Sequence, residues 1–190
     1  IEKLTNYSQR KKNLEKRKKI LEEREDDKSK KELKILEKLF TLGSVNFDSI
    51  IIIDFGSSLK SVLSSLVYTD VDDTIVLIST VNQWFDESIF KKNLVKNLYF
   101  PSVDMKQFKK YNENYFKSFG MKPYEITILA YDALGLIHYV WKKNKDINSI
   151  NDFFIKEKIK GKIGTFRFKD KKVSQHLKIY KTDKGKFKEY

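Results

Sequence analysis

The sequence of 190 residues predicts an α/β protein built on a Rossmann-like, doubly wound parallel sheet. Two runs of β-branched residues, Phe47–Asp54 and Thr74–Thr80, have the length and the nearly continuous apolar character of parallel strands covered on both faces. Between them, apolar residues recur at helical spacing, at Leu59, Val62, Leu63 and Leu66. A strand, a helix and a second strand in this order are typical of a parallel crossover unit.

The segment before this unit predicts a pair of charged helices. Its few apolar side chains include three at a spacing of seven residues, Tyr7, Leu14 and Leu21. We expect the break between the helices at Asp26–Ser29, with Ser29 as the cap of the second helix and Gly43 as the residue that ends it. A coiled-coil arm is the alternative, although the heptad pattern is short and broken.

The later part predicts a short strand over Leu98–Val103 and then two helices. Apolar residues after Asp104 form a helical stripe that ends at Gly120. Pro123 opens the next helix, whose apolar face runs from Ile126 to Trp141.

The final thirty residues predict β structure. Gly164–Phe168 and Leu177–Tyr180 alternate polar and apolar side chains on either side of Lys169–Lys172. Asp183–Gly185 marks a last turn.

Composition narrows the classes of function. The chain has no cysteine, which excludes disulfides, zinc–thiolate sites and thiol nucleophiles. No apolar run approaches the roughly 20 residues of a membrane span. The net charge of +13 raises a nucleic-acid-binding hypothesis centred on the Arg10–Lys19 helix, which predicts binding that falls steeply with salt. The lysines are spread along the whole chain, however, so we expect a biased genome composition and no nucleic-acid partner.

Several strings, in the right order, resemble the later half of the Leu/Ile/Val-binding-protein superfamily, the type I periplasmic solute-binding fold. Phe47–Ile52 is similar to its strand that begins Phe-Asp, and Phe108, Tyr111 and Phe119–Gly120 are similar to one of its helices. Ala130–Ala133 matches its Ala-Tyr-Asp-Ala helix. The closing pattern of the family is matched by Gly161, Gly164, Phe166, Phe168, Leu177 and Tyr180.

The charged helical pair, Asp70–Asp72 and Gln83–Asp86 resemble one branch of the superfamily, the lipoprotein activators of penicillin-binding proteins. This implies a regulator of peptidoglycan synthesis in the periplasm that docks on a peptidoglycan synthase, with outer-membrane attachment through a segment upstream of Ile1. The alternative is the substrate-binding protein of an ABC transporter, which would carry an amino acid, amide or peptide to its permease. Asn93–Asn97 departs from the glycine-rich segment of the family and leaves the crossover geometry open.

The resemblance also implies a division into lobes that close on a ligand. Residues 1–100 would form an incomplete lobe two, residues 101–160 would be helices of lobe one, and residues 161–190 would return to lobe two as a closing β segment. Because the parent sheet of the Ile126–Trp141 helix would be missing, we expect its apolar face to be exposed or buried against a second copy.

The candidate ligand-binding residues follow the two predicted strands, because ligands of such sheets bind beyond the carboxyl ends of the strands. Amide groups and hydroxyls at a helix N-terminus suit an anion, and an indole beside amides suits a sugar or a peptide. The alternatives are that Ser57 only caps its helix and that Trp84 only packs. The candidates are Asp54, Phe55, Gly56, Ser57 and Ser58 in the first loop, and Thr80, Asn82, Gln83 and Trp84 in the second.

One departure favours the activator branch over an amino-acid receptor. Amino-acid-binding members of the superfamily place an acidic residue after the second strand, where this chain has Val81 and Asn82, which leaves Asp54 as a substitute anchor. His138 and His176 stand outside any recognisable triad or metal set, and we expect Asp132 to make a structural hydrogen bond. We therefore expect a binding protein, not an enzyme, with no metal site and no cofactor.

Overall fold

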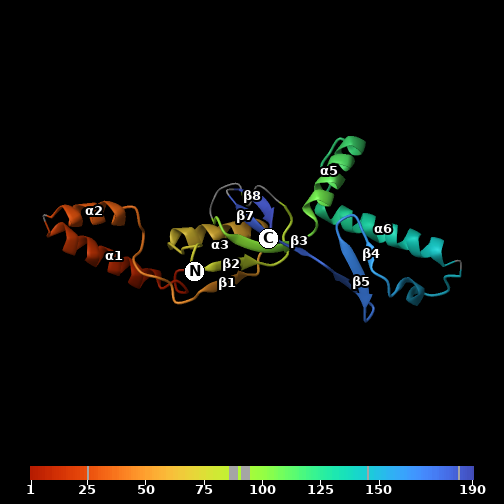
Figure 1. The fold of residues 1–190 in the computed structure, drawn as a ribbon, viewed down its shortest axis with the longest axis horizontal. Coiled ribbons are helices and arrows are strands. Elements are labelled where there is room, and N and C mark those ends of the chain that lie inside the picture. Colours follow the sequence, from red (N-terminus) through yellow and green to blue (C-terminus); the bar gives the residue numbers. More distant parts are fainter. Residues whose placement is uncertain (25, 86–89, 91–94, 145, 184) are drawn as a thin grey trace. The chain divides into compact units, whose positions relative to one another are not determined.

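The computed structural model describes residues 1–190 except residues 25, 86–89, 91–94, 145 and 184 (Figure 1). Asp86, Asn93, Leu94 and Lys184, which belong to strings discussed above, lie outside the described residues. The chain divides into two compact units, one of residues 1–100 and 180–188 and one of residues 101–179 and 189–190. The assignment of particular segments to lobes stays a prediction.

The first unit begins with a helical hairpin, α1 (Tyr7–Glu22) and α2 (Asp27–Leu36), so both predicted helices are confirmed. Leu14, Leu21 and Leu36 are buried together between the two helices. Gly43 has a left-handed φ of 106°, but it lies beyond the end of α2, whose last cap is Glu37. The prediction that Gly43 ends the helix is therefore wrong.

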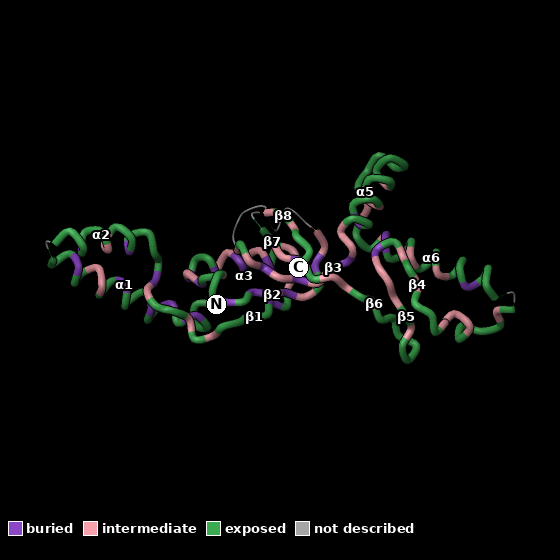
Figure 2. The backbone as a smooth tube through the Cα atoms, viewed as in Figure 1, coloured by how far each residue is buried: buried purple, intermediate pink, exposed green. Residues whose placement is uncertain are grey.

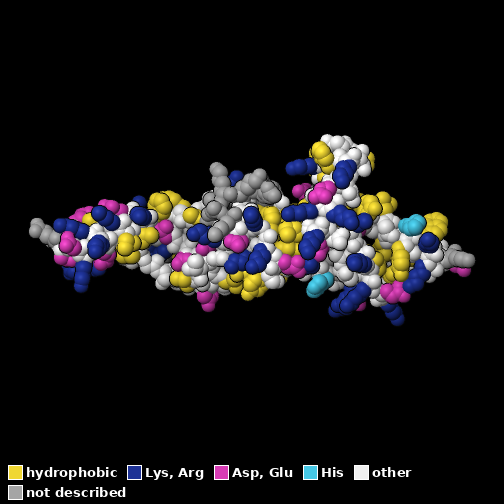
Figure 3. Space-filling model, turned by 45° about the horizontal axis from the view of Figure 1, so that its top comes forward, with side chains coloured by type: hydrophobic (Ala, Val, Ile, Leu, Met, Phe, Trp, Pro, Cys, Tyr) yellow, Lys and Arg dark blue, Asp and Glu magenta, His cyan; other side chains and the backbone are white. Residues whose placement is uncertain are grey.

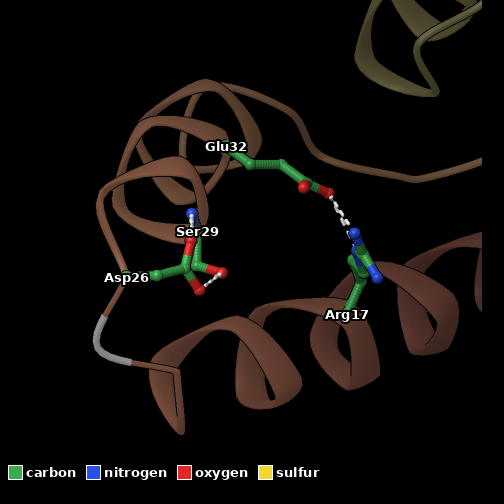
Figure 4. A network of polar contacts seen from close by, with 4 residues as sticks. All are labelled: Arg17, Asp26, Ser29 and Glu32. Atoms are coloured by element: carbon green, nitrogen blue, oxygen red, sulfur yellow. Dashed lines mark hydrogen bonds and ion pairs between the residues drawn. The ribbon is translucent and has the colours of Figure 1, made fainter.

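Asp26, not Ser29, caps α2 (Figure 4). One carboxylate oxygen of Asp26 accepts the Ser29 amide hydrogen at 2.9 Å, and the other accepts the Ser29 hydroxyl at 2.7 Å. These hydrogen bonds to Ser29 hold the pKa of Asp26 below its ordinary value. A carboxylate is a more stabilising cap than a hydroxyl here, because it accepts two hydrogen bonds at the positive end of the helix.

A five-stranded sheet follows, in the order β1-β2-β3-β7-β8. The first three strands, β1 (Ser49–Ile52), β2 (Leu77–Thr80) and β3 (Leu98–Ser102), run parallel, with Ile52 beside Thr80 and Ile78 beside Leu98. The helix between β1 and β2 is α3 (Gly56–Tyr68). The remaining strands are β7 (Lys178–Asp183) and β8 (Lys186–Glu189). This confirms the predicted α/β class and the predicted parallel neighbours.

The core of this unit lies on one face of the sheet. Leu59, Leu63 and Leu66 of α3 pack against the inward-facing residues of the strands, Ile52, Val76, Ile78 and Leu98. On the opposite face, Ile51 and Ile53 are 71% and 78% exposed, and Ile75 and Leu77 are exposed as well. The prediction that both strands are covered on two faces is therefore wrong for this chain, because α3 packs against one face and leaves the alternate residues on the other face exposed.

The second unit combines two helices with a small antiparallel sheet. Helix α5 (Met105–Phe119) begins with Asp104, whose carboxylate accepts the Gln107 amide hydrogen at 2.9 Å, and ends at Gly120 in the left-handed region. Helix α6 (Glu125–Lys143) is followed by a short 3-10 turn, η1 (Ile150–Phe153). The sheet consists of β4 (Ile159–Lys160), β5 (Thr165–Lys169) and β6 (Lys172–Gln175).

Helix α6 is exposed along most of its length (Figure 2). Trp141 is 70% exposed, and Ile126, Leu129, Leu134 and Ile137 are also exposed, whereas Ile128 and Val140 are buried. Most of this apolar face is therefore exposed in the single chain, as predicted, and its burial against a second copy stays a prediction. Among the described residues, no helix is long and apolar enough to cross a membrane.

Candidate functional site

The two candidate loops begin side by side at the carboxyl ends of β1 and β2. Ile52 and Thr80 are register partners at the ends of these strands, and the Thr80 hydroxyl donates a hydrogen bond of 2.7 Å to the Ile52 carbonyl oxygen. The buried Gln83 amide then donates to the Asp54 carbonyl oxygen at 2.8 Å. The structure thus brings the first and second loops together, as expected for parallel strands.

Asp54 holds the start of α3 with both of its carboxylate oxygens. One oxygen accepts the Phe55 amide hydrogen at 2.8 Å, and the other accepts the Ser58 hydroxyl at 2.7 Å. The hydrogen bond from Ser58, with the one from the Phe55 amide, lowers the pKa of Asp54, so the group is a carboxylate at neutral pH. The cap position of α3 is Phe55, and no side chain caps the helix, so the capping role considered for Ser57 is wrong.

Among the described residues of the two loops, two polar side chains remain available, those of Ser57 and Asn82. Both are exposed, and within the described part of the chain neither side chain makes a hydrogen bond. Phe55 of the first loop is exposed, and Trp84 of the second is half-buried. The first amide groups of α3, at Gly56 and Ser57, point out of the helix start without intrahelical acceptors. The edge therefore offers hydroxyl, amide and aromatic contacts to a small polar ligand.

The basic helix considered for nucleic acid has one of its two arginines buried. Arg10 is only 5% exposed, and its guanidinium group donates to the carbonyl oxygens of Gly43 at 2.8 Å, Thr69 at 2.7 Å and Asp70 at 3.0 Å. Burial lowers the pKa of Arg10, and the nearby Asp70 carboxylate opposes this shift. Lysine and arginine side chains are otherwise spread over the visible face (Figure 3).

Asp70 completes a clamp between the hairpin and α3. Its carboxylate accepts the amide hydrogens of Phe40 and Thr41 at 2.7 and 2.6 Å, and also the Thr41 hydroxyl at 3.1 Å. The Leu42 amide donates to the Arg10 carbonyl oxygen at 3.0 Å. Sequence reasoning missed this arrangement, which we call the Arg10 clamp, because its partners are far apart in the chain.

Asp132 has the structural role that the sequence predicts. Its carboxylate oxygens accept the amide hydrogens of Lys162 at 2.7 Å and Ile163 at 3.3 Å. A side chain at Gly161 would place a Cβ atom 2.8 Å from the carboxyl carbon of Asp132 and 3.1 Å from the Phe166 ring. The two sequence strings at Ala130–Ala133 and at Gly161 are therefore parts of one contact.

The described residues contain no group of three or more histidine or acidic side chains placed to hold a metal ion. His138 lies on α6, and His176 follows β6.

Comparison with solved structures places the fold among type I periplasmic binding proteins. An extracellular ligand binding receptor from Desulfohalobium retbaense superimposes with a TM-score of 0.57 at 12% identity, over 75% of this chain and 26% of that one. A leucine binding protein, LivK, from Thermotoga maritima gives a TM-score of 0.55 at 15% identity, over 76% of this chain and 44% of that one. The chain thus spans less than half the length of both. No protein-family model and no curated protein sequence matches it.

Proposed function

We propose that this protein is a non-enzymatic binding protein that acts in the periplasm or outside the cell. The observation that carries the proposal is the type I periplasmic binding fold with polar loops at the adjoining ends of β1 and β2. The similar structures are named as an extracellular ligand binding receptor and a leucine binding protein, which supports a binding role in this compartment.

Within this class, we favour a regulator that docks on a peptidoglycan synthase, as the penicillin-binding protein activators do. Asp54 is engaged at the start of α3, and the position after β2 carries Val81 and Asn82, so the loop residues that the structure describes offer no unengaged carboxylate to an amino-acid ammonium group. The exposed apolar face of β1 and β2, with Ile51 and Ile53, supplies a surface of the kind that protein partners cover.

A substrate-binding protein of an ABC transporter is the second candidate. It is favoured by the exposed side chains of Ser57 and Asn82 beside the amide groups of α3, which could hold a ligand carboxylate.

A thermal-shift screen with amino acids, short peptides and muropeptides separates these candidates, because a ligand specific to the native state raises the melting temperature. A shift that Asn82→Ala or Ser57→Ala abolishes supports the transport receptor. Ser61→Ala is the matched control, since Ser61 is an exposed serine one turn further along α3. A shift that survives both loop variants would contradict ligand binding at this edge.

Docking is tested by capture of a purified peptidoglycan synthase. Ile53→Lys is expected to reduce capture by placing a charge in the apolar face, whereas Ile150→Lys, at an equally exposed isoleucine of the second unit, is expected to leave it unchanged. Equal capture by the wild-type chain and Ile53→Lys would contradict docking through this face.

A further inference from the structure

A cavity in the second unit, separate from the candidate loops, has the charge and shape of an anion-binding site. Its volume is about 540 Å³, within the usual range for small-ligand pockets. Helix α6 forms one wall with Tyr131, Asp132 and Tyr139, and the segment around β4 forms the other. All of its lining residues belong to the second unit.

Three lysines of the β4 segment are among the residues that line this cavity. Lys158, Lys160 and Lys162 are exposed, and they line the cavity together with the intervening Ile159 and Gly161. Among the described residues, no ion pair involves any of them, although Lys143 pairs with the neighbouring Glu157 at 2.6 Å. Within the part of the chain that the structure describes, the cavity lining thus carries three lysines without an ion pair to a carboxylate.

The acidic residue in the lining does not serve these lysines. Both carboxylate oxygens of Asp132 face main-chain amide groups of the 161–164 turn, as described above. With three lysines and one aspartate, the lining carries two net positive charges. A phosphate monoester carries about −1.5 to −2 at neutral pH, which matches this balance.

Aromatic and amide groups complete the lining. The Lys162 ammonium group lies 5.9 Å from the centre of the Tyr131 ring, at a distance typical of cation–π contacts. Tyr139 and the Gln107 amide lie on the same lining. Lysines act as point charges that suit the tetrahedral phosphate group, whereas planar carboxylates are more often held by arginine.

From this arrangement we infer that the cavity between α6 and β4 binds a small phosphate ester that carries a ring. The phosphate group lies among Lys158, Lys160 and Lys162, and the ring packs against Tyr131 and Tyr139. This site is independent of the loops at β1 and β2, so its success or failure leaves the proposed function unaffected.

The test is calorimetric titration of the full chain with phenyl phosphate. We expect saturable binding with a dissociation constant below about 1 mM, weaker binding of inorganic phosphate, and no binding of phenol. The triple variant Lys158→Gln, Lys160→Gln, Lys162→Gln is expected to weaken binding at least about tenfold, because it removes the positive lining. The matched control replaces three lysines at the β5–β6 turn, Lys169, Lys171 and Lys172, by glutamine and is expected to retain binding.

Two results would overturn the inference. One is the absence of saturable binding to the wild-type chain, and the other is equal weakening by both triple variants, which would mean attraction to net charge alone. A second measurement needs no variant: phenyl phosphate should protect Lys158, Lys160 and Lys162 from acetylation, read by mass spectrometry, and should not protect Lys169. Equal acetylation of all four lysines with and without phenyl phosphate would also refute the site.

Discussion

Replacement of Arg10 by alanine is expected to release the α1–α2 hairpin from the rest of the first unit. The change removes a charged donor from three carbonyl groups, of which the one at Thr69 is in a buried hydrogen bond. An unsatisfied buried acceptor costs about 2 kcal/mol, and the two part-buried bonds contribute about 1 kcal/mol each. The free energy that holds the clamp closed should therefore fall by about 4 kcal/mol, or nearly a thousandfold in the opening equilibrium.

Hydrogen exchange measures this opening at the amides that join the hairpin to α3. The Thr41 and Leu42 amides donate to Asp70 and to the Arg10 carbonyl oxygen, so their exchange reports the clamp directly. Hydrogen exchange suits this prediction better than global unfolding, because a chain of two units need not unfold in a single transition.

Arg17→Ala is the control for this prediction. Arg17 forms an exposed ion pair with Glu32 at 2.7 Å (Figure 4), and such pairs contribute about 0 to 1 kcal/mol. Acceleration of Thr41 and Leu42 exchange by less than about tenfold in Arg10→Ala, or by similar factors in both variants, would refute the argument.

Four further predictions concern other elements. Asp170 and Lys171 form a two-residue turn with φ values of 51° and 60°, so Lys171→Gly should raise stability by about 0.5 to 1 kcal/mol in thermal melts, and a lower melting temperature would contradict this. Gly161→Ala should lower the melting temperature, because its Cβ would meet the Asp132 carboxyl group; an unchanged value would refute the contact. The pKa of Asp26 is lowered in the folded chain. The carboxylate therefore stabilises the fold fully at a pH above about 3.8, the ordinary pKa of the group, and this stabilisation is lost as the pH falls through the lower folded pKa. Acid titration followed by circular dichroism should show this loss in the wild-type chain but not in Asp26→Asn. Identical curves for the two chains would contradict the prediction. Trp141→Glu should reduce concentration-dependent association in sedimentation velocity, because Trp141 is exposed on the apolar side of α6; association that is unchanged would exclude this face.

Local patterns were sufficient to predict most elements of the fold. The isoleucine-rich run predicted β1 and the helical spacing after it predicted α3, because each signal lies within a few neighbouring residues. The adjacency of the candidate loops then followed from the parallel pairing of β1 with β2.

Burial and long-range polar contacts could not be predicted in the same way. An isoleucine run indicates a strand that can be covered on both faces, but only the three-dimensional arrangement shows that Ile51 and Ile53 are exposed. Arg10 appeared to be one charge among many, and its burial depends on carbonyl groups 33 to 60 positions away. Ser29 was the predicted cap of α2, but Asp26 takes that position, and this depends on side-chain geometry that the sequence does not give.

The Arg10 clamp also determines which substitutions the chain can tolerate. Arg10 donates to main-chain carbonyl groups, and these are present whichever side chains occupy positions 43, 69 and 70. The three hydrogen bonds therefore require an arginine side chain at position 10 but do not depend on the side chains of the partner residues. A change at position 10 alone removes all three bonds. Substitutions at the three partner positions leave the carbonyl acceptors in place and are limited by other features: the left-handed backbone at Gly43, the burial of Thr69 and the hydrogen bonds of the Asp70 carboxylate.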